Sequence, residues 1–272
     1  MWTLVAKLAL TPAIVVATTL VGRRFGGAVS GWLVGLPLMS GPITLFFAVE
    51  QGKQFAARAS VGSLSGTLAE AGFCLGWAQV ARRAPWPVAL AAGSASFAVV
   101  GLAAELLPLD PSLPVPLGPL ALVSLLFLVA ALRLLPRLKL ELRDEVLPPR
   151  WELPARAIVA TVLLLLLTGL ATVLGARLSG LLTVYPLYTV VLAAFAHAHE
   201  GEAGAVQVLR GLLMGLYSFV CFYLVLALVL PAASVIASFA VALAAALGVQ
   251  GSSLLALRRE CAREDSNLRP TA

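Results

Sequence analysis

Glu70 is the residue whose type and position point most directly to chemistry. It lies near the centre of an apolar run at 59–81, and the nearest charged residues are Arg58 and Arg82. An ionised carboxylate is unfavourable inside a membrane, so such a residue faces a bundle interior, pairs with a cation or is protonated. Proton or cation coupling is therefore one hypothesis for Glu70. A neutral, hydrogen-bonded structural role is the alternative.

Two apolar runs are interrupted by proline, within the segments Gly35–Pro42 and Thr183–Thr189. Proline removes an amide donor and frees backbone groups that lipid cannot satisfy. Paired helix interruptions of this kind are typical of transporter binding sites near the bilayer midplane. A simple kink, repaired by a neighbouring Ser or Thr, is the alternative. The candidate substrate-contacting residues are Pro37, Ser40, Tyr185, Pro186, Tyr188 and Thr189.

Polar residues also stand at the far ends of these two runs. They are Glu50 in the first run and His197, His199 and Glu200 in the second, and a gating or proton-relay role is a hypothesis for each. Solvated helix ends are the alternative. Residues two apart on a helix point about 200° apart, so the two histidines do not form a ready metal chelate.

Enzyme signatures are weak. The segment Gly62–Gly66 is similar to a serine nucleophile motif, but Leu64 occupies the position that the serine requires. The sequence has no phosphate-binding loop and no zinc-binding His-Glu-x-x-His motif. We therefore expect no enzyme activity, no catalytic residues, no cofactor and no metal.

The elements that position these residues are predicted from composition. Hydrophobic residues make up 60% of the 272 and charged residues only 12%, which excludes an ordinary soluble domain. Apolar runs predict an all-α membrane protein with nine transmembrane helices. These runs lie at 2–21, 28–49, 59–81, 87–108, 117–135, 155–174, 178–198, 206–229 and 232–256.

Basic residues test this segmentation because cytoplasmic loops collect Lys and Arg. With nine spans, one side of the membrane holds only Lys7, Lys53, Arg58 and Arg177, and the other side holds the remaining fifteen of the 19 basic residues. This bias predicts an N-terminus outside and a C-terminus in the cytoplasm. It also accounts for the basic excess without a nucleic-acid partner.

An internal repeat relates residues 1–52 to 150–201 at an offset of 149. The first copy starts at span one and the second at span six. Because five crossings separate them, the copies are predicted to be inverted four-helix repeats joined by one linker helix. The predicted regions are a first repeat at 1–108, a linker helix and cytoplasmic loop at 109–154, a second repeat at 155–257 and a disordered tail at 258–272.

The repeat resembles the GlpM-like family of small bacterial inner-membrane proteins. The matching positions are Lys7, Gly31, Pro37 and Gly52 in the first copy, and Arg156, Gly180, Pro186 and Gly201 in the second. Glu50 fits an acidic position of that pattern, whereas the second copy has His199 there. The resemblance implies a bacterial inner-membrane location and is compatible with a role in envelope production.

The predicted function is that of a small secondary transporter or permease for an unidentified small solute, with proton coupling through Glu70 as a hypothesis. The alternative is a non-transporting scaffold or accessory protein of cell-envelope biosynthesis. The expected partners are the lipid bilayer and the solute, and a homodimer is left open.

Overall fold

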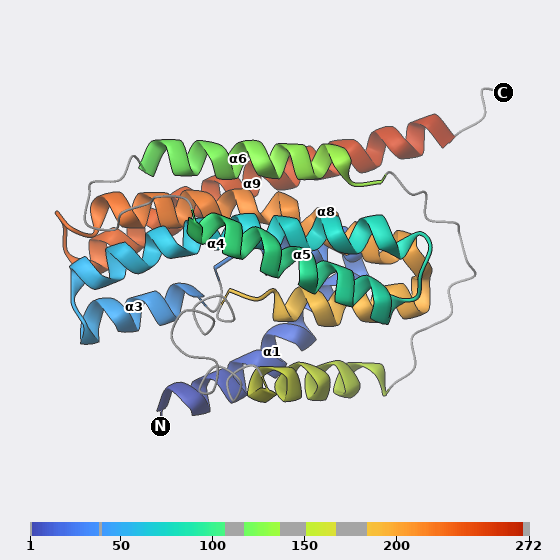
Figure 1. Ribbon diagram of the computed structural model, residues 1–272, viewed down its shortest axis with the longest axis horizontal. Coiled ribbons are helices and arrows are strands. Elements are labelled where there is room, and N and C mark those ends of the chain that lie inside the picture. The colour runs from blue at the N-terminus through green and yellow to red at the C-terminus, as the bar shows by residue number, and fades with distance from the viewer. Residues whose placement is uncertain (1, 38–39, 107–116, 137–150, 167–183, 269–272) are drawn as a thin grey trace.

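The computed structural model describes residues 2–37, 40–106, 117–136, 151–166 and 184–268. Every regular element in these ranges is a helix, which confirms the predicted all-α class. The helices are α1 (Trp2–Phe25), α2 (Gly27–Val34), α3 (Ser40–Glu50), α4 (Lys53–Ala81), α5 (Trp86–Leu106), α6 (Leu117–Leu134), a helix at 152–166, α8 (Leu187–Val229) and α9 (Val235–Leu268). Figure 1 shows the long helices lying along a common direction.

Four of the described helices are long and apolar enough to cross a membrane. These candidate spans are Trp86–Ala104, Leu117–Leu134, Leu187–Val229 and Val235–Ser252. A hydrocarbon core about 30 Å thick needs about 20 apolar residues in a helix. The helices therefore indicate a membrane-embedded protein, as the composition predicts.

Glycine separates three pairs of consecutive helical segments. Gly26, Gly52 and Gly201 have φ angles of 92°, 91° and 77°, with ψ angles of 160°, 162° and −164°. This backbone region is essentially restricted to glycine. Gly201 divides α8 into segments at 187–200 and 202–229, which appear in Figure 1 as two rods joined at one end. At 43 residues, an unbroken α8 would be about 65 Å long, far more than one membrane crossing requires.

The centre of the bundle is formed by α4 and α8. Helix α4 packs against α3, α5, α6 and α8, and α8 also packs against α2 and α9. The largest fully buried side chains include Trp77 and Phe73 of α4 and Tyr223 of α8. Buried aromatic side chains of both central helices therefore form part of one hydrophobic core.

Several predicted boundaries differ from the observed ones. Helix α4 starts at Lys53 rather than 59, because the polar residues after Gly52 continue the helix beyond the apolar run. The C-terminal segment predicted to be disordered from 258 is helical as far as Leu268. Its Leu, Ala, Arg and Glu residues favour helix even though the segment is polar. The linker at 137–150 and parts of the spans predicted at 155–174 and 178–198 lie outside the described residues.

Candidate functional site

The first predicted helix interruption is present, since α2 ends at Val34 and α3 begins at Ser40. At the second, residues 184–186 are not helical and α8 begins at Leu187, while the residues at 167–183 lie outside the described part of the chain. Pro37 and Pro186 are buried at these breaks. At the first break Gln250 of α9 donates a hydrogen bond from Nε2 to the Trp32 carbonyl oxygen, at 2.9 Å. A buried side chain therefore satisfies one of the carbonyl groups near the end of α2.

Hydroxyl groups gather where α3 begins. The Tyr223 hydroxyl of α8 lies 3.4 Å from the Thr44 hydroxyl of α3. The side chains of Ser40, from α3, and Ser63, from α4, also lie within hydrogen-bonding reach of Tyr223. Tyr223 is fully buried, and a buried phenol needs such partners. One tyrosine therefore connects the first interruption to the central helix α4.

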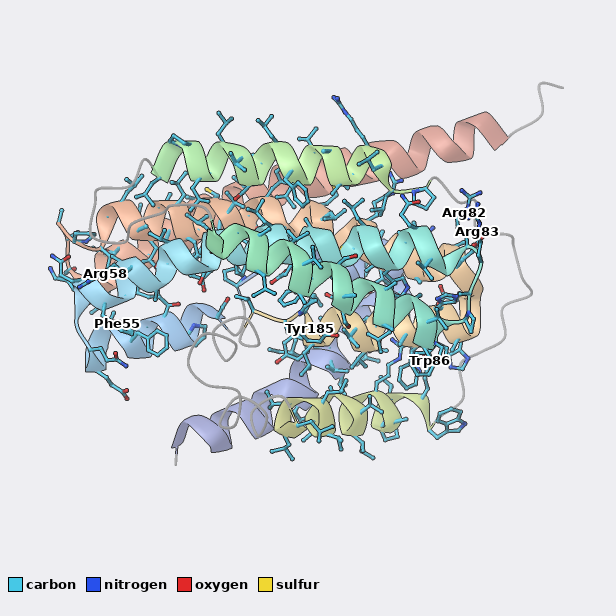
Figure 2. All side chains as sticks on the ribbon, viewed as in Figure 1. Phe55, Arg58, Arg82, Arg83, Trp86 and Tyr185 are labelled. Carbon is cyan, nitrogen blue, oxygen red and sulfur yellow. The ribbon has the colours of Figure 1, made fainter. Side chains whose placement is uncertain are left out.

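The second interruption packs against the same helix. A Cβ added to Gly66 of α4 would lie 2.9 Å from Cγ1 of Val184, so α4 and the interrupted segment approach closely there. The hydroxyl of the next residue, Tyr185, lies 2.7 Å from the Ser94 hydroxyl of α5. Its ring also packs edge-on against Phe73, with 6.0 Å between ring centroids. Figure 2 shows Tyr185 lying between the two ends of the bundle.

Glu70 projects between these two contact points. On a helix with 3.6 residues per turn, Glu70 points about 40° away from Gly66 and about 20° away from Ser63. Gly66 faces the second interruption, and Ser63 faces Tyr223 and the first. Along the axis Glu70 lies about 6 Å beyond Gly66 and about 10 Å beyond Ser63. Around the helix axis, Glu70 therefore lies between the side of α4 that contacts Val184 and the side that contacts Tyr223, one to two turns further along the helix.

Glu70 lies in a largely buried stretch of α4. From Gly66 to Cys74, it is the only residue of the helix that is not buried, and it is partly exposed. Within the described part of the chain, the carboxylate makes no hydrogen bond or ion pair, while Tyr223 lies close enough to interact with it electrostatically.

The remaining candidate substrate residues differ in position. Thr189 is 1% exposed, and its Oγ1 has no hydrogen-bond partner among the described residues. Tyr188 packs instead against a separate cluster that contains Val15, Ala160 and Val191. Tyr188 is therefore directed toward α1 and the helix at 152–166, away from the residues around Glu70.

Charged residues cluster where the first segment of α8 ends. Glu152 accepts hydrogen bonds from both Arg156 and Arg23, and its contact with Arg23 measures 2.9 Å. The guanidinium of Arg156 also lies 4.9 Å from the ring centre of Phe195. Glu200 interacts electrostatically with Arg156. These contacts connect α1, the helix at 152–166 and α8.

The predicted gating residues do not form one group. His199 lies beside Phe195 and interacts with Glu200, whereas His197 packs against Trp77 with 6.4 Å between ring centroids. Glu50 is exposed at the end of α3, close in the chain to Lys53, which donates a hydrogen bond to the Ala233 carbonyl oxygen at 3.0 Å. Labelled Arg58 and Arg82 lie at opposite ends of the bundle in Figure 2.

Two residues of the hydroxyl cluster, Thr44 and Ser63, were missing from the sequence prediction. They join Tyr223 through packing between distant segments, for which the sequence carries no local motif. The close helix contacts do have a signal in the sequence, which is a glycine at every fourth residue. It occurs at Gly27, Gly31 and Gly35 of the first interrupted run and at Gly211 and Gly215 of α8.

No protein-family profile, curated protein or solved structure matches the chain.

Proposed function

We propose that the protein is a small secondary transporter of a bacterial inner membrane, with Glu70 as its coupling carboxylate. The observation that carries this proposal is the position of Glu70 on α4, whose neighbouring turns contact Val184 just before α8 through Gly66 and Tyr223 near the start of α3 through Ser63. Interrupted helices leave backbone groups that a substrate or ion can meet, and a carboxylate inside a membrane is unfavourable unless it has a function or a partner.

The proposed topology has nine spans, with α2 and α3 forming the second and the two segments of α8 forming the seventh and eighth. Gly66 contacts Val184, and Trp77, further along α4, contacts His197 in the first segment of α8. Because both residue numbers increase together, α4 is parallel to the first segment of α8. Lys53 at the start of α4 meets Ala233 just after α8, so α4 is antiparallel to the second segment. These directions agree with odd and even spans crossing in opposite senses.

The proposed inverted repeat is supported by equivalent contacts. Gly35 packs against Gly215, and Val184 packs against Gly66. Adding 149 to Gly35 gives Val184, and subtracting 149 from Gly215 gives Gly66. The same offset relates α4 to the antiparallel second segment of α8, as an inversion requires, and it relates Gly52 to Gly201, which share an unusual backbone conformation.

Transport is tested with the purified full chain in sealed lipid vesicles. Uptake of a panel of labelled small solutes is measured with and without an inward proton gradient. We expect at least one solute to accumulate and Glu70→Gln to lose the dependence on the gradient. Glu202→Gln is the control because it removes a carboxylate away from the site. If no solute moves, the envelope scaffold is favoured; if coupling survives in Glu70→Gln, that residue is excluded from the mechanism.

Membrane orientation is tested separately with single cysteines at Gln54 and Arg83, after replacement of the three native cysteines. A membrane-impermeant maleimide applied to intact cells should label position 54 and leave position 83 unlabelled, because the basic residues place position 83 in the cytoplasm. Equal labelling of the two positions would contradict the proposed topology.

The GlpM-like resemblance remains a prediction. It is the basis for proposing a bacterial inner membrane as the location of the protein.

A further inference from the structure

Helix α1 and the helix at 152–166 share a small apolar contact with α8. Val15 of α1 and Ala160 of the second helix are 0% exposed and pack with Leu187 and Val191 of α8, in a cluster distinct from the main core. Figure 1 shows α1 and the helix at 152–166 together along one side of the bundle. These two helices therefore form a pair that has its own buried contact with α8.

One end of this helix pair carries an ion cluster, formed by Arg23, Glu152 and Arg156. Glu152 accepts hydrogen bonds from Arg23 of α1, at 2.9 Å, and from Arg156 on its own helix. The Arg156 guanidinium also lies 4.9 Å from the ring centre of Phe195 and interacts electrostatically with Glu200, and both of these residues belong to α8. Contacts between charged or aromatic groups therefore join three helices at this end.

Ion pairing suits a contact that opens into water. Withdrawing charges from water is unfavourable, and a buried ion pair often only partly offsets this cost. Separating the ion pair returns its charges to water, whereas separating an apolar contact exposes a surface whose hydration is unfavourable. The Arg23 side chain is already 31% exposed, so water reaches the edge of the cluster. Charged residues at this end therefore permit an opening that apolar side chains would oppose.

Non-helical glycines adjoin the ion cluster on two of its helices. Gly26 is three residues beyond Arg23, and Gly201 directly follows Glu200. Both glycines have a positive φ angle at the junction between consecutive helical segments. A few residues at the ends of helices commonly absorb the changes in φ and ψ when packed helices move. Helix α1 and the first segment of α8 can therefore change their angles to the following helices without bending internally.

We propose that the ion cluster of Arg23, Glu152 and Arg156 is a cytoplasmic gate. In this structure the cluster is joined, and it closes the cytoplasmic end of the contact between the helix pair and α8. In the open state Arg23 leaves Glu152, Arg156 leaves Phe195, and water enters between the helices. The inference rests on the proposed transport function for its biological role and on the distribution of basic residues for the side of the membrane.

The test measures how fast N-ethylmaleimide labels a buried cysteine behind the gate. Ala160 lies one helical turn beyond Arg156, so Ala160→Cys is introduced into the full chain without its native cysteines, in lipid vesicles. We expect Arg23→Gln to accelerate labelling of position 160 at least tenfold, because maleimides react with a thiolate in contact with water. Arg23→Lys keeps the charge and should give a smaller increase. Arg24→Gln is the matched control and should leave the rate unchanged, because the described contact of Arg24 is with the Phe25 ring.

A second buried position distinguishes opening of the gate from unfolding. Ala246 of α9 is also 0% exposed and belongs to the main core, so Ala246→Cys should label slowly in the Arg23→Gln background. Faster labelling of both positions would show a general loss of packing and overturn the inference. An unchanged rate at position 160, or an equal acceleration by Arg24→Gln, would overturn it as well.

Labelling requires no solute, so its outcome is separate from that of the transport assay. Faster labelling of position 160 alone, in a protein that moves no solute, supports opening at the ion cluster and contradicts transport. Solute uptake together with an unchanged labelling rate contradicts the gate and leaves transport supported.

Discussion

Gly35 and Gly215 lie so close together that a Cβ added to Gly35 would be 2.5 Å from the Gly215 Cα. The glycines Gly31 and Gly211 make similar backbone approaches along the same pair of segments, to Val208 and Ala28 respectively. Small residues allow membrane helices to approach closely and gain van der Waals contact. The first interrupted run is therefore held against the second segment of α8 by a surface that has no room for side chains.

Gly35→Ala should destabilise the protein by about 1–3 kcal/mol, because the added methyl group overpacks backbone atoms that cannot rotate away. Gly66→Ala should have a smaller effect, since its nearest neighbour is the Val184 side chain. Gly248→Ala is the control, with no atom within 4 Å of the added Cβ. Thermal unfolding in detergent measures the three, and equal stability of Gly35→Ala and Gly248→Ala would contradict the close crossing.

Gly52→Ala and Gly201→Ala should each destabilise the protein by about 1–3 kcal/mol through backbone strain. No atom lies within 4 Å of a Cβ added at either position, so a steric clash cannot explain such a loss. Gly62→Ala is the matched control within α4, where the space is also open and alanine favours helix. Thermal unfolding of the three variants is the measurement. Unchanged stability of both Gly52→Ala and Gly201→Ala would contradict the positive φ angles at these residues.

Glu152→Gln should destabilise the protein by about 3–5 kcal/mol, because it leaves the guanidinium of Arg156 without its carboxylate. Glu152 is 2% exposed and Arg156 is 8% exposed, so water cannot replace the lost partner. Adding Arg156→Gln should recover part of the loss, and unfolding of the single and double variants gives the coupling. Additive effects of the two substitutions would show that the ion pair does not contribute as described.

Tyr223→Phe removes the hydroxyl that connects Ser40, Thr44 and Ser63 while keeping the buried ring. The protein should lose about 0.5–1.5 kcal/mol of stability, the net value of one hydrogen bond. Tyr217→Phe is the control, because Tyr217 is a half-buried tyrosine of the same helix outside the hydroxyl cluster. Thermal unfolding of the two variants is the measurement, and equal stability of both would contradict the hydrogen bonding at Tyr223.

The sequence predicts individual helices where an apolar run is long enough to cross a membrane. The run at 117–135 becomes α6, and the run at 87–108 becomes α5. Pro37 locates the break between α2 and α3, and Pro186 directly precedes the start of α8, since a missing amide donor acts locally. Hydropathy is less informative at helix ends, where polar residues with helical propensity extend α4 and α9 beyond their apolar segments.

The site itself depends on contacts between distant segments, and the sequence predicts it only in part. Glu70 is identified by its lone charge, but the buried Tyr223 of the hydroxyl cluster cannot be distinguished by sequence from the other tyrosines. Likewise, Glu152 and Arg23 are 129 residues apart, and no local pattern relates them. Tyr188 illustrates the opposite error. It lies within α8 and packs against a different cluster, whereas Tyr185 precedes the start of that helix at Leu187.

The central claim is that both interrupted helices meet α4 beside Glu70, and a disulfide cross-link tests it most directly. A Cβ at Gly66 would lie 3.1 Å from the Val184 Cβ, near the separation found in disulfides. In membranes containing the chain without its native cysteines, Gly66→Cys with Val184→Cys should cross-link on mild oxidation. Gly62→Cys with Val184→Cys, one helical turn away, should not. Cross-linking of the Gly62 pair without the Gly66 pair, or of neither pair, would contradict the account.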